Sequence, residues 1–164
     1  MDLIIWRIPT LNSSGKRIVA QAVAVAEFPI GLAPARIPGI TELLERALTL
    51  VPADSHEAGR LLSRYGGILG IAEGDYEGAQ QALRRAIAIA KREGDVQLEV
   101  QTLAYTADVS GQHLLWQDSV DNGLRAIELA AGDETAFSEV LSRFWIAVSL
   151  LYIDRKSTRL NSSH

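Results

Sequence analysis

A short helical sequence recurs three times along this chain at nearly constant spacing. Glu45–Leu50 reads ERALTL, Arg84–Ile89 reads RRAIAI, and Leu124–Leu129 reads LRAIEL. The copies begin at Glu45, Arg84 and Leu124, so the repeat period is about 40 residues. Helix pairs repeated at this spacing are typical of α-solenoids, in which each pair buries the apolar face that its neighbour leaves open. The repeat therefore predicts an all-α fold of stacked antiparallel helix pairs.

Turn signals divide the repeat region into six expected helices. Pro52 closes the first helix, and the pairs Gly74-Asp75, Gly94-Asp95 and Gly132-Asp133 each separate two later ones. A glycine ends a helix by adopting positive φ, and an aspartate after it can cap the free N–H groups of the next helix. With the apolar periodicity, these signals predict helices over 41–51, 55–73, 76–92, 96–112, 116–131 and 135–153.

The chain divides into three parts. Residues 1–39 hold four of the five prolines and show no sustained period, so we expect an irregular lead-in with a short helix over Arg17–Glu27. Residues 40–153 carry the helical repeats. Residues 154–164 are expected to be disordered, because Lys156 stands one repeat period after Trp116, where the register requires an aromatic residue. The lead-in has a second interpretation, a misassigned start, which the abrupt change in composition at residue 40 motivates.

The last ten residues resemble a sequence of foreign origin. Arg155–His164 reads RKSTRLNSSH, which is similar to the translation of an adaptor found at truncated ends of assembled genes. We therefore exclude this segment from the fold prediction. The alternative is a genuine disordered tail.

Composition and motifs exclude several classes of function. The formal net charge is −4, which argues against a broad surface for nucleic acid. Without cysteine there is no disulfide framework and no thiol chemistry, and no run of 18 apolar residues suggests a membrane span. The three histidines lack metal-ligand spacing, and no nucleophile motif or phosphate loop occurs. We expect a cytoplasmic protein without catalytic activity, cofactor, metal, membrane contact or direct nucleic-acid contact.

The repeat resembles the tetratricopeptide family. The resemblance rests on Gly74-Asp75-Tyr76 with Ala79, Leu83 and Ala86, and in the next copy on Ala107, Trp116, Ser119 and Ala126. The chain departs from the family pattern at Gly66 and Gly70, which replace apolar residues, and at Leu114-Leu115, which replaces the Gly-Asp turn. Its period is also longer than the family standard of about 34 residues. The resemblance implies a superhelix of antiparallel pairs whose first helices line a concave groove.

The longer period is similar to that of repeat arrays in large bacterial signalling proteins. Leu44–Ser55 and Gly74–Asp95 resemble the arrays of LuxR-type ATP-binding transcriptional regulators and of ATPase-coupled cyclases. One hypothesis is a module of a larger regulator that binds a protein or peptide segment, or a small effector. The alternative is an accessory repeat region of a multidomain enzyme, an adenylate or guanylate cyclase or an ATPase, whose catalytic domain is absent here.

The family groove predicts which residues bind the partner. Carried over by register, the groove is lined by Arg64 and Ile68 in the first copy, and by Phe144 and Val148 in the third. Gln101, Asp108 and Gln112 line it in the second copy. The polar members are the better candidates, so the predicted binding residues are Arg64, Gln101, Asp108 and Gln112.

The last expected helix carries a broad apolar stripe. The stripe consists of Phe137, Val140, Leu141, Phe144, Trp145, Val148, Leu151 and Tyr152. A single neighbouring helix cannot cover all of it, and solenoids normally end in a capping helix with a polar outer face. We therefore expect self-association through this uncapped helix.

Overall fold

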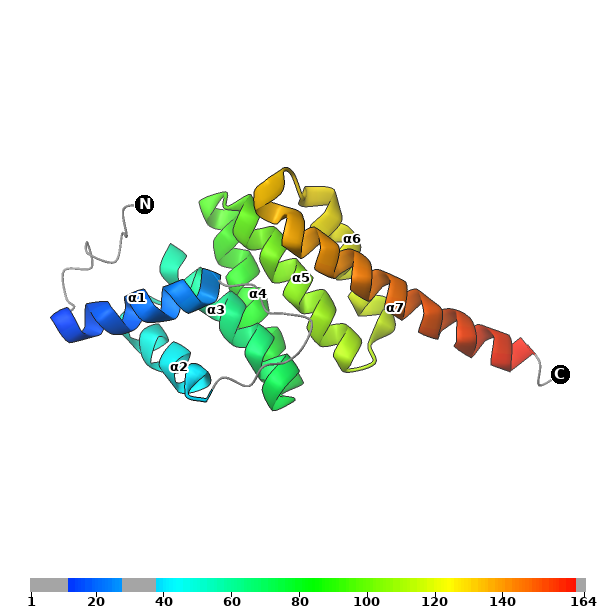
Figure 1. Ribbon diagram of the computed structural model, residues 1–164, viewed down its shortest axis with the longest axis horizontal. Coiled ribbons are helices and arrows are strands. Elements are labelled where there is room, and N and C mark those ends of the chain that lie inside the picture. The colour runs from blue at the N-terminus through cyan, green and yellow to red at the C-terminus, as the bar shows by residue number, and fades with distance from the viewer. Residues whose placement is uncertain (1–11, 28–37, 162–164) are drawn as a thin grey trace.

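The computed structural model describes residues 12–27 and 38–161, and over these residues the chain is all-helical, without a strand. The predicted all-α class is therefore confirmed. The helices, shown in Figure 1, are α1 Ser13–Glu27, α2 Ile40–Leu50, α3 His56–Ile68, α4 Tyr76–Glu93, α5 Val96–Gln112, α6 Trp116–Leu129 and α7 Ala136–Asn161. A π-helical turn η2, Leu69–Glu73, prolongs α3, and a 3-10 turn η3, Asp133–Thr135, precedes α7. The rest of the predicted lead-in and the last residues of the predicted tail lie outside the described residues.

Side-chain caps and glycines set the helix ends much as the sequence predicted. Ser55 accepts a hydrogen bond from Ala58 N at 3.1 Å, and Asp75 and Asp95 each accept one from the N–H three residues on at 2.9 Å. Gly74 and Gly94 end the preceding segments with φ of 75° and 69°. α2, α4, α5 and α6 lie within two residues of their predicted bounds, and so does α3 when η2 is counted with it.

The turn between α5 and α6 has no glycine at its positive-φ position and no side-chain cap. Leu114 adopts a φ of 63° there, where a side chain is disfavoured, and Leu115 precedes α6 with no side-chain cap. His113 Nε2 lies 2.9 Å from Gly70 O instead, and its ring stands 5.1 Å from that of Tyr76. Contacts to η2 and α4 therefore hold this turn where local sequence does not favour it.

The helix expected within the lead-in is present, and it packs into the core. Residues 13–27 form α1, which starts before the expected helix and contacts α2 and α3. Val19, Ala22 and Val23 are buried in one apolar cluster with residues of α2, α3 and α4. The apolar run at Ile18–Ala26 therefore supplies a core helix, because α2 and α3 offer it a face to cover.

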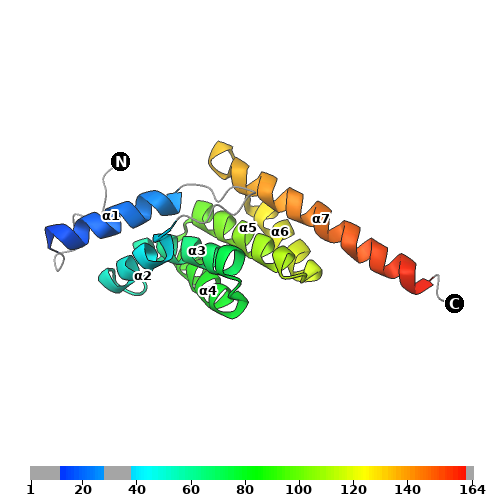
Figure 2. The same ribbon diagram turned by 60° about the horizontal axis from the view of Figure 1, so that its bottom comes forward.

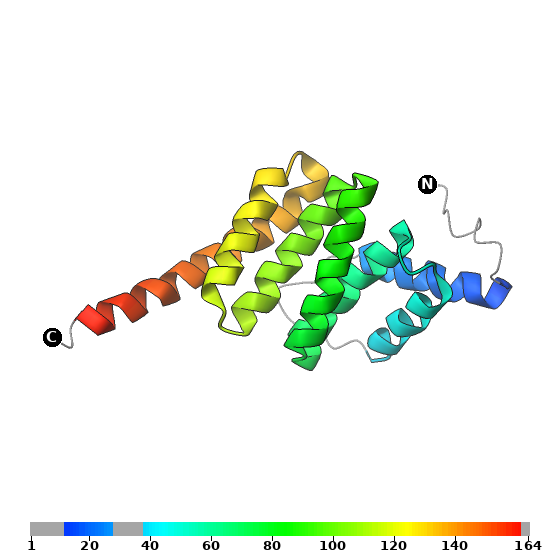
Figure 3. The same cartoon turned by 180° about the vertical axis from the view of Figure 1, so that it is seen from behind.

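The helices from α3 onward follow one another as antiparallel neighbours. Each contacts the next, and α3, α5 and α7 also lie side by side, so that α5 is surrounded by α3, α4, α6 and α7. Figures 1 and 2 show this succession across the molecule, and Figure 3 shows α4 and α6 on the opposite face. The alternation places equivalent positions of α3 and α5 next to each other.

Small residues allow the helices to approach closely. Ala47, Ala86 and Ala126, which share one position in the three sequence copies, are 0% exposed. At Gly70, an added Cβ would lie 2.5 Å from Val109 Cγ1, so no side chain fits there. This departure from the family pattern is therefore a site of close contact between η2 and α5.

The last helix is longer than predicted. α7 continues past residue 153 to Asn161, so the segment 154–161 is helical rather than disordered. Its sequence holds no glycine or proline, and its Arg, Lys and Leu are good helix formers. All three ribbon views show the C-terminal half of α7 extending beyond the other helices.

One side of α7 contacts α5 and α6, and the other side is exposed. Tyr152 stacks on Trp116 of α6 with ring centroids 4.4 Å apart. Residues Ala136–Arg155 are long and apolar enough to cross a membrane, with a mean hydropathy of 1.4 and 17% of the segment buried. Length and composition alone do not distinguish such a span from a helix covered by protein.

Candidate functional site

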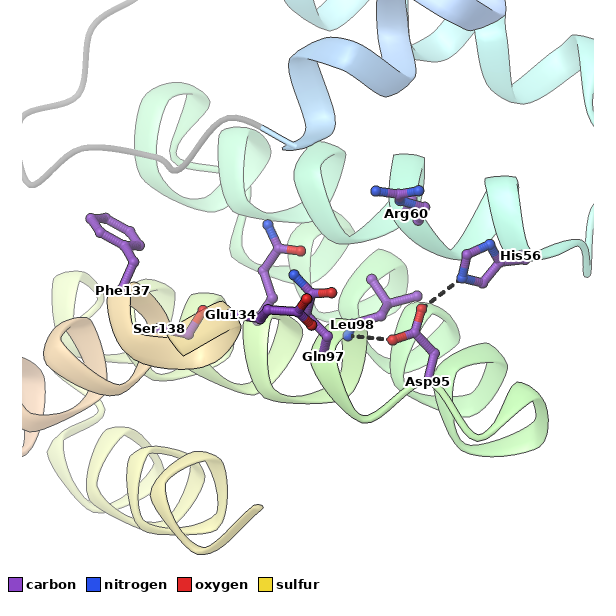
Figure 4. A pocket seen from close by; sticks show the side chains of 9 residues that line it. His56, Arg60, Asp95, Gln97, Leu98, Glu134, Phe137 and Ser138 are labelled. Carbon is purple, nitrogen blue, oxygen red and sulfur yellow. Dashed lines mark hydrogen bonds and ion pairs between the residues drawn. The ribbon is translucent and has the colours of Figure 1, made fainter. Parts of the chain in front are cut away.

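A polar pocket lies where the first turns of α3, α5 and α7 meet. Its volume is about 290 Å³, and the close-up in Figure 4 shows its side chains. Because α3, α5 and α7 run in the same direction, their N-terminal ends share one edge of the molecule. The lining residues are His56, Arg60, Asp95, Gln97, Leu98, Gln101, Glu134, Phe137 and Ser138.

A hydrogen bond joins α3 and α5 at one side of the pocket. His56 Nε2 donates to Asp95 Oδ2 at 2.6 Å, and both side chains are about two-thirds buried. The other carboxylate oxygen of Asp95 caps α5 by accepting from Leu98 N at 2.9 Å. The two functions fix the orientation of this carboxylate, as the dashed lines in Figure 4 indicate.

The surroundings of Asp95 favour its charged form. Burial raises the pKa of this carboxyl, but the hydrogen bonds from His56 and Leu98 N, together with the charges of His56 and Arg60, hold the pKa below its ordinary value. Asp95 is therefore ionised near neutral pH. It supplies a fixed negative charge beside the Arg60 guanidinium.

The remaining lining offers hydrogen-bonding groups and one aromatic ring. Gln101 Nε2 lies 3.2 Å from Tyr105 Oη and 3.5 Å from Ala26 O of α1. The exposed amide of Gln97 lies one helical turn before it, and exposed Phe137 stands across the pocket on α7 (Figure 4). Such a lining can bind main-chain amides and polar side chains, and it offers an apolar surface at one rim.

The described residues offer little for metal-dependent chemistry. No group of three His, Cys, Asp or Glu side chains within them could hold an ion. His56 and Asp95 are only two candidate ligands, and they are already hydrogen-bonded to each other.

The four predicted binding residues do not share one surface. Gln101 alone lines the pocket. Arg64 and Asp108 are 7% and 3% exposed, so they lie inside the helix stack rather than on a groove, and Gln112 is exposed at the far end of α5. Gln112 Nε2 donates to Asp108 Oδ1 at 3.1 Å.

Asp108 is a buried carboxyl between α5 and α7. Burial raises its pKa to about 6, while Gln112 and the Trp145 indole lower it only in part. The Nε1 atom of Trp145 is buried near this carboxyl, but no hydrogen bond joins the two groups. Asp108 is therefore a group within the α5–α7 contact, and its ionisation carries a cost in folding.

The sequence pattern did not predict that His56, Arg60 and Asp95 line one pocket. The sequence predicted Asp95 as a helix cap, which is confirmed, and it showed no metal-ligand spacing for His56. A signal was available, because these two residues are 39 apart, close to the repeat period. Equivalent residues of consecutive repeats lie side by side in a solenoid, so the spacing could have predicted the contact.

Comparison with protein-family models, with characterised proteins and with solved structures finds no match to this chain.

Proposed function

We propose that residues 40–153 form a tetratricopeptide-like repeat module that binds a polypeptide segment in the pocket between α3, α5 and α7. The observation that carries this proposal is the contact between residues one repeat apart. His56 bonds Asp95, and the hydroxyls of Ser63 and Thr102 lie 2.9 Å apart, each pair separated by 39 residues. A solenoid of helix pairs brings the first helices of successive repeats together in this way.

The chemistry of the pocket favours a polar, extended ligand. The Gln97 amide can donate to a main-chain carbonyl, and Gln101 Oε1 can accept from a main-chain N–H. Arg60 can bind an acceptor, and Phe137 can cover an apolar side chain. A volume of about 290 Å³ is suited to one or two residues of a segment that runs across the helix ends. A small effector of the same chemistry would use the same groups.

The module is proposed to act by binding alone. Its lining supplies no activated nucleophile, so any reaction would belong to another part of a larger protein. We propose a transcription regulator of the LuxR type as that parent, with a cyclase or an ATPase as the alternative. A helix-turn-helix encoded in the same reading frame would favour the regulator, and a cyclase domain would favour the enzyme.

A displayed library of random peptides tests segment binding. Peptides selected on the purified chain are measured by fluorescence anisotropy against the wild type and the double variant Gln97→Ala, Gln101→Ala. We expect the double variant to lose about tenfold or more in affinity, since two hydrogen-bonding side chains of the lining are removed. Gln117→Ala on α6 is the matched control and should bind as the wild type does. Failure to enrich any peptide, or equal binding by the double variant, would contradict the proposal.

A further inference from the structure

The outward face of α7 carries a line of apolar residues that none of the other described helices covers. Val140, Phe144 and Leu151 are between 43% and 66% exposed, and Ala147 between them is also exposed. We call these four residues the α7 stripe. Trp145 and the buried serines of α7 lie on the opposite side, against α5 and α6.

The spacing of the α7 stripe is that of a helix-pairing seam. Its members follow one another at intervals of four, three and four residues. This alternation keeps side chains on one line of a helix, where they can interlock with those of a second helix. The stripe therefore fits an apolar helix laid along α7 better than a globular surface.

The α7 stripe differs from the surface on which the repeats stack. The residues 40 positions earlier on α5 are Val100, Ala104, Ala107 and Gly111, all of them buried. Three of these four are alanine or glycine, which suits the close approach of the neighbouring helices. On α7 the equivalents of Ala104 and Gly111 are Phe144 and Leu151, whose side chains would hold a helix farther away. α7 is therefore built for a different neighbour than the next repeat helix.

We propose that the α7 stripe binds the same stripe of a second copy of this chain, with the two α7 helices antiparallel. In this register Phe144 lies opposite Ala147 of the second copy, and Val140 lies opposite Leu151. The large Phe144 side chain then faces the small Ala147, and each contact occurs twice in the symmetric pair. The interface so formed is isologous and closed, so association stops at the dimer.

Size and charge favour the antiparallel over the parallel arrangement. A parallel pair would oppose Phe144 to Phe144 and leave a gap where Ala147 meets Ala147. It would also place the two Asp154 side chains, which continue the seam three residues after Leu151, against each other. Antiparallel pairing separates these like charges along the helices.

Charged groups beside the α7 stripe argue against a lipid as its occupant. Arg143 forms an ion pair with Glu139 at 2.7 Å, and the Arg143 side chain is 62% exposed. A membrane would have to take this pair out of water, whereas a second helix can leave it at the edge of the seam.

Light scattering coupled to size-exclusion chromatography tests the dimer on the full chain. We expect the wild type to shift from monomer to dimer as its concentration rises. Leu151→Glu should raise the dimer dissociation constant about 100-fold, because the symmetry applies the lost burial twice. Leu124→Glu, at an exposed leucine of α6, is the matched control and should dimerise as the wild type does. A monomer at all concentrations, or a dimer that Leu151→Glu leaves intact, would overturn the proposal.

Cysteine cross-linking tests the orientation, because the chain has no cysteine of its own. Val140→Cys mixed with Leu151→Cys should form a disulfide-linked pair, and Leu151→Cys alone should not. Cross-linking of Leu151→Cys with itself would overturn the antiparallel arrangement. Sedimentation of a monomeric wild type with phosphatidylcholine vesicles, abolished by Leu151→Glu, would overturn the proposal in favour of a membrane.

Discussion

The Trp145 indole lies against Gly111, so that a Cβ at position 111 would overlap the ring. Gly111 is buried near the end of α5, and Trp145 lies midway along α7. The contact therefore depends on the absence of a side chain at one residue and on the size of the other. It holds the last helix of the stack against its central one.

We expect Gly111→Ala to lower the free energy of unfolding by about 2 kcal/mol, since overpacking of a close contact forces the ring to move. Chemical denaturation followed by circular dichroism measures the change. In a Trp145→Leu background the same substitution should cost less, because the ring that it overlaps is gone. Equal costs in the two backgrounds would show that the contact with Trp145 is not what disfavours a side chain at residue 111.

Charge introduced at the shared alanine position should be severely destabilising. Ala86 and Ala126 are 0% exposed, so Ala86→Asp or Ala126→Asp buries an unpaired carboxylate and should cost about 4 kcal/mol or more. Ala88→Asp is the control, because Ala88 is exposed on the same helix as Ala86. A thermal melt in which Ala86→Asp unfolds within a few degrees of Ala88→Asp would contradict the packing described.

Asp108 should make stability fall as pH rises through a defined window. Its pKa is about 6 in the folded protein against an ordinary value of 3.8, so the folded state binds the proton more tightly than the unfolded chain. The free energy of unfolding should therefore fall between about pH 4 and pH 6, by about 3 kcal/mol from this group. Asp108→Asn should remove this pH dependence. Subtracting the variant's free energy of unfolding from that of the wild type at each pH cancels the contribution of the other carboxyls. Denaturation curves that stay parallel across this window would contradict the assignment.

The turn between α5 and α6 should be open to stabilisation. Leu114 holds a positive φ with its side chain 67% exposed, so Leu114→Gly removes strain with little loss of packing. We expect a gain of about 1 kcal/mol in the free energy of unfolding, measured by urea denaturation. Leu114→Ala keeps a Cβ in the same conformation and should show no comparable gain. Equal effects of glycine and alanine would mean that the backbone at residue 114 is not strained.

The fold was predictable where local signals and tertiary contacts agree. Asp75 and Asp95 cap α4 and α5, as expected from the Gly-Asp pairs that precede these helices. The sequence did not predict α1 as a core helix, because its apolar run is short and becomes a buried face only through contact with α2 and α3. The sequence underestimated the length of α7, because residues 154–161 favour helix by their own propensity but show no apolar period.

The candidate site was less predictable because α5 is covered on every side. Residues 102–111 are all buried, so their sequence shows no polar face from which a groove could be identified. The register placed Asp108 on the groove, whereas α7 covers it. The 39-residue spacing of His56 and Asp95 carried better information, because it predicts adjacency without requiring a solvent-facing side.

The serial arrangement of the helices has a mechanical consequence. α1 contacts α2 and α3, and α7 contacts α5 and α6, so tension applied between the two ends passes from one helix pair to the next. Each pair that detaches leaves the contacts of the following pairs intact. We therefore expect the chain to unfold under tension from its ends, in successive steps of extension.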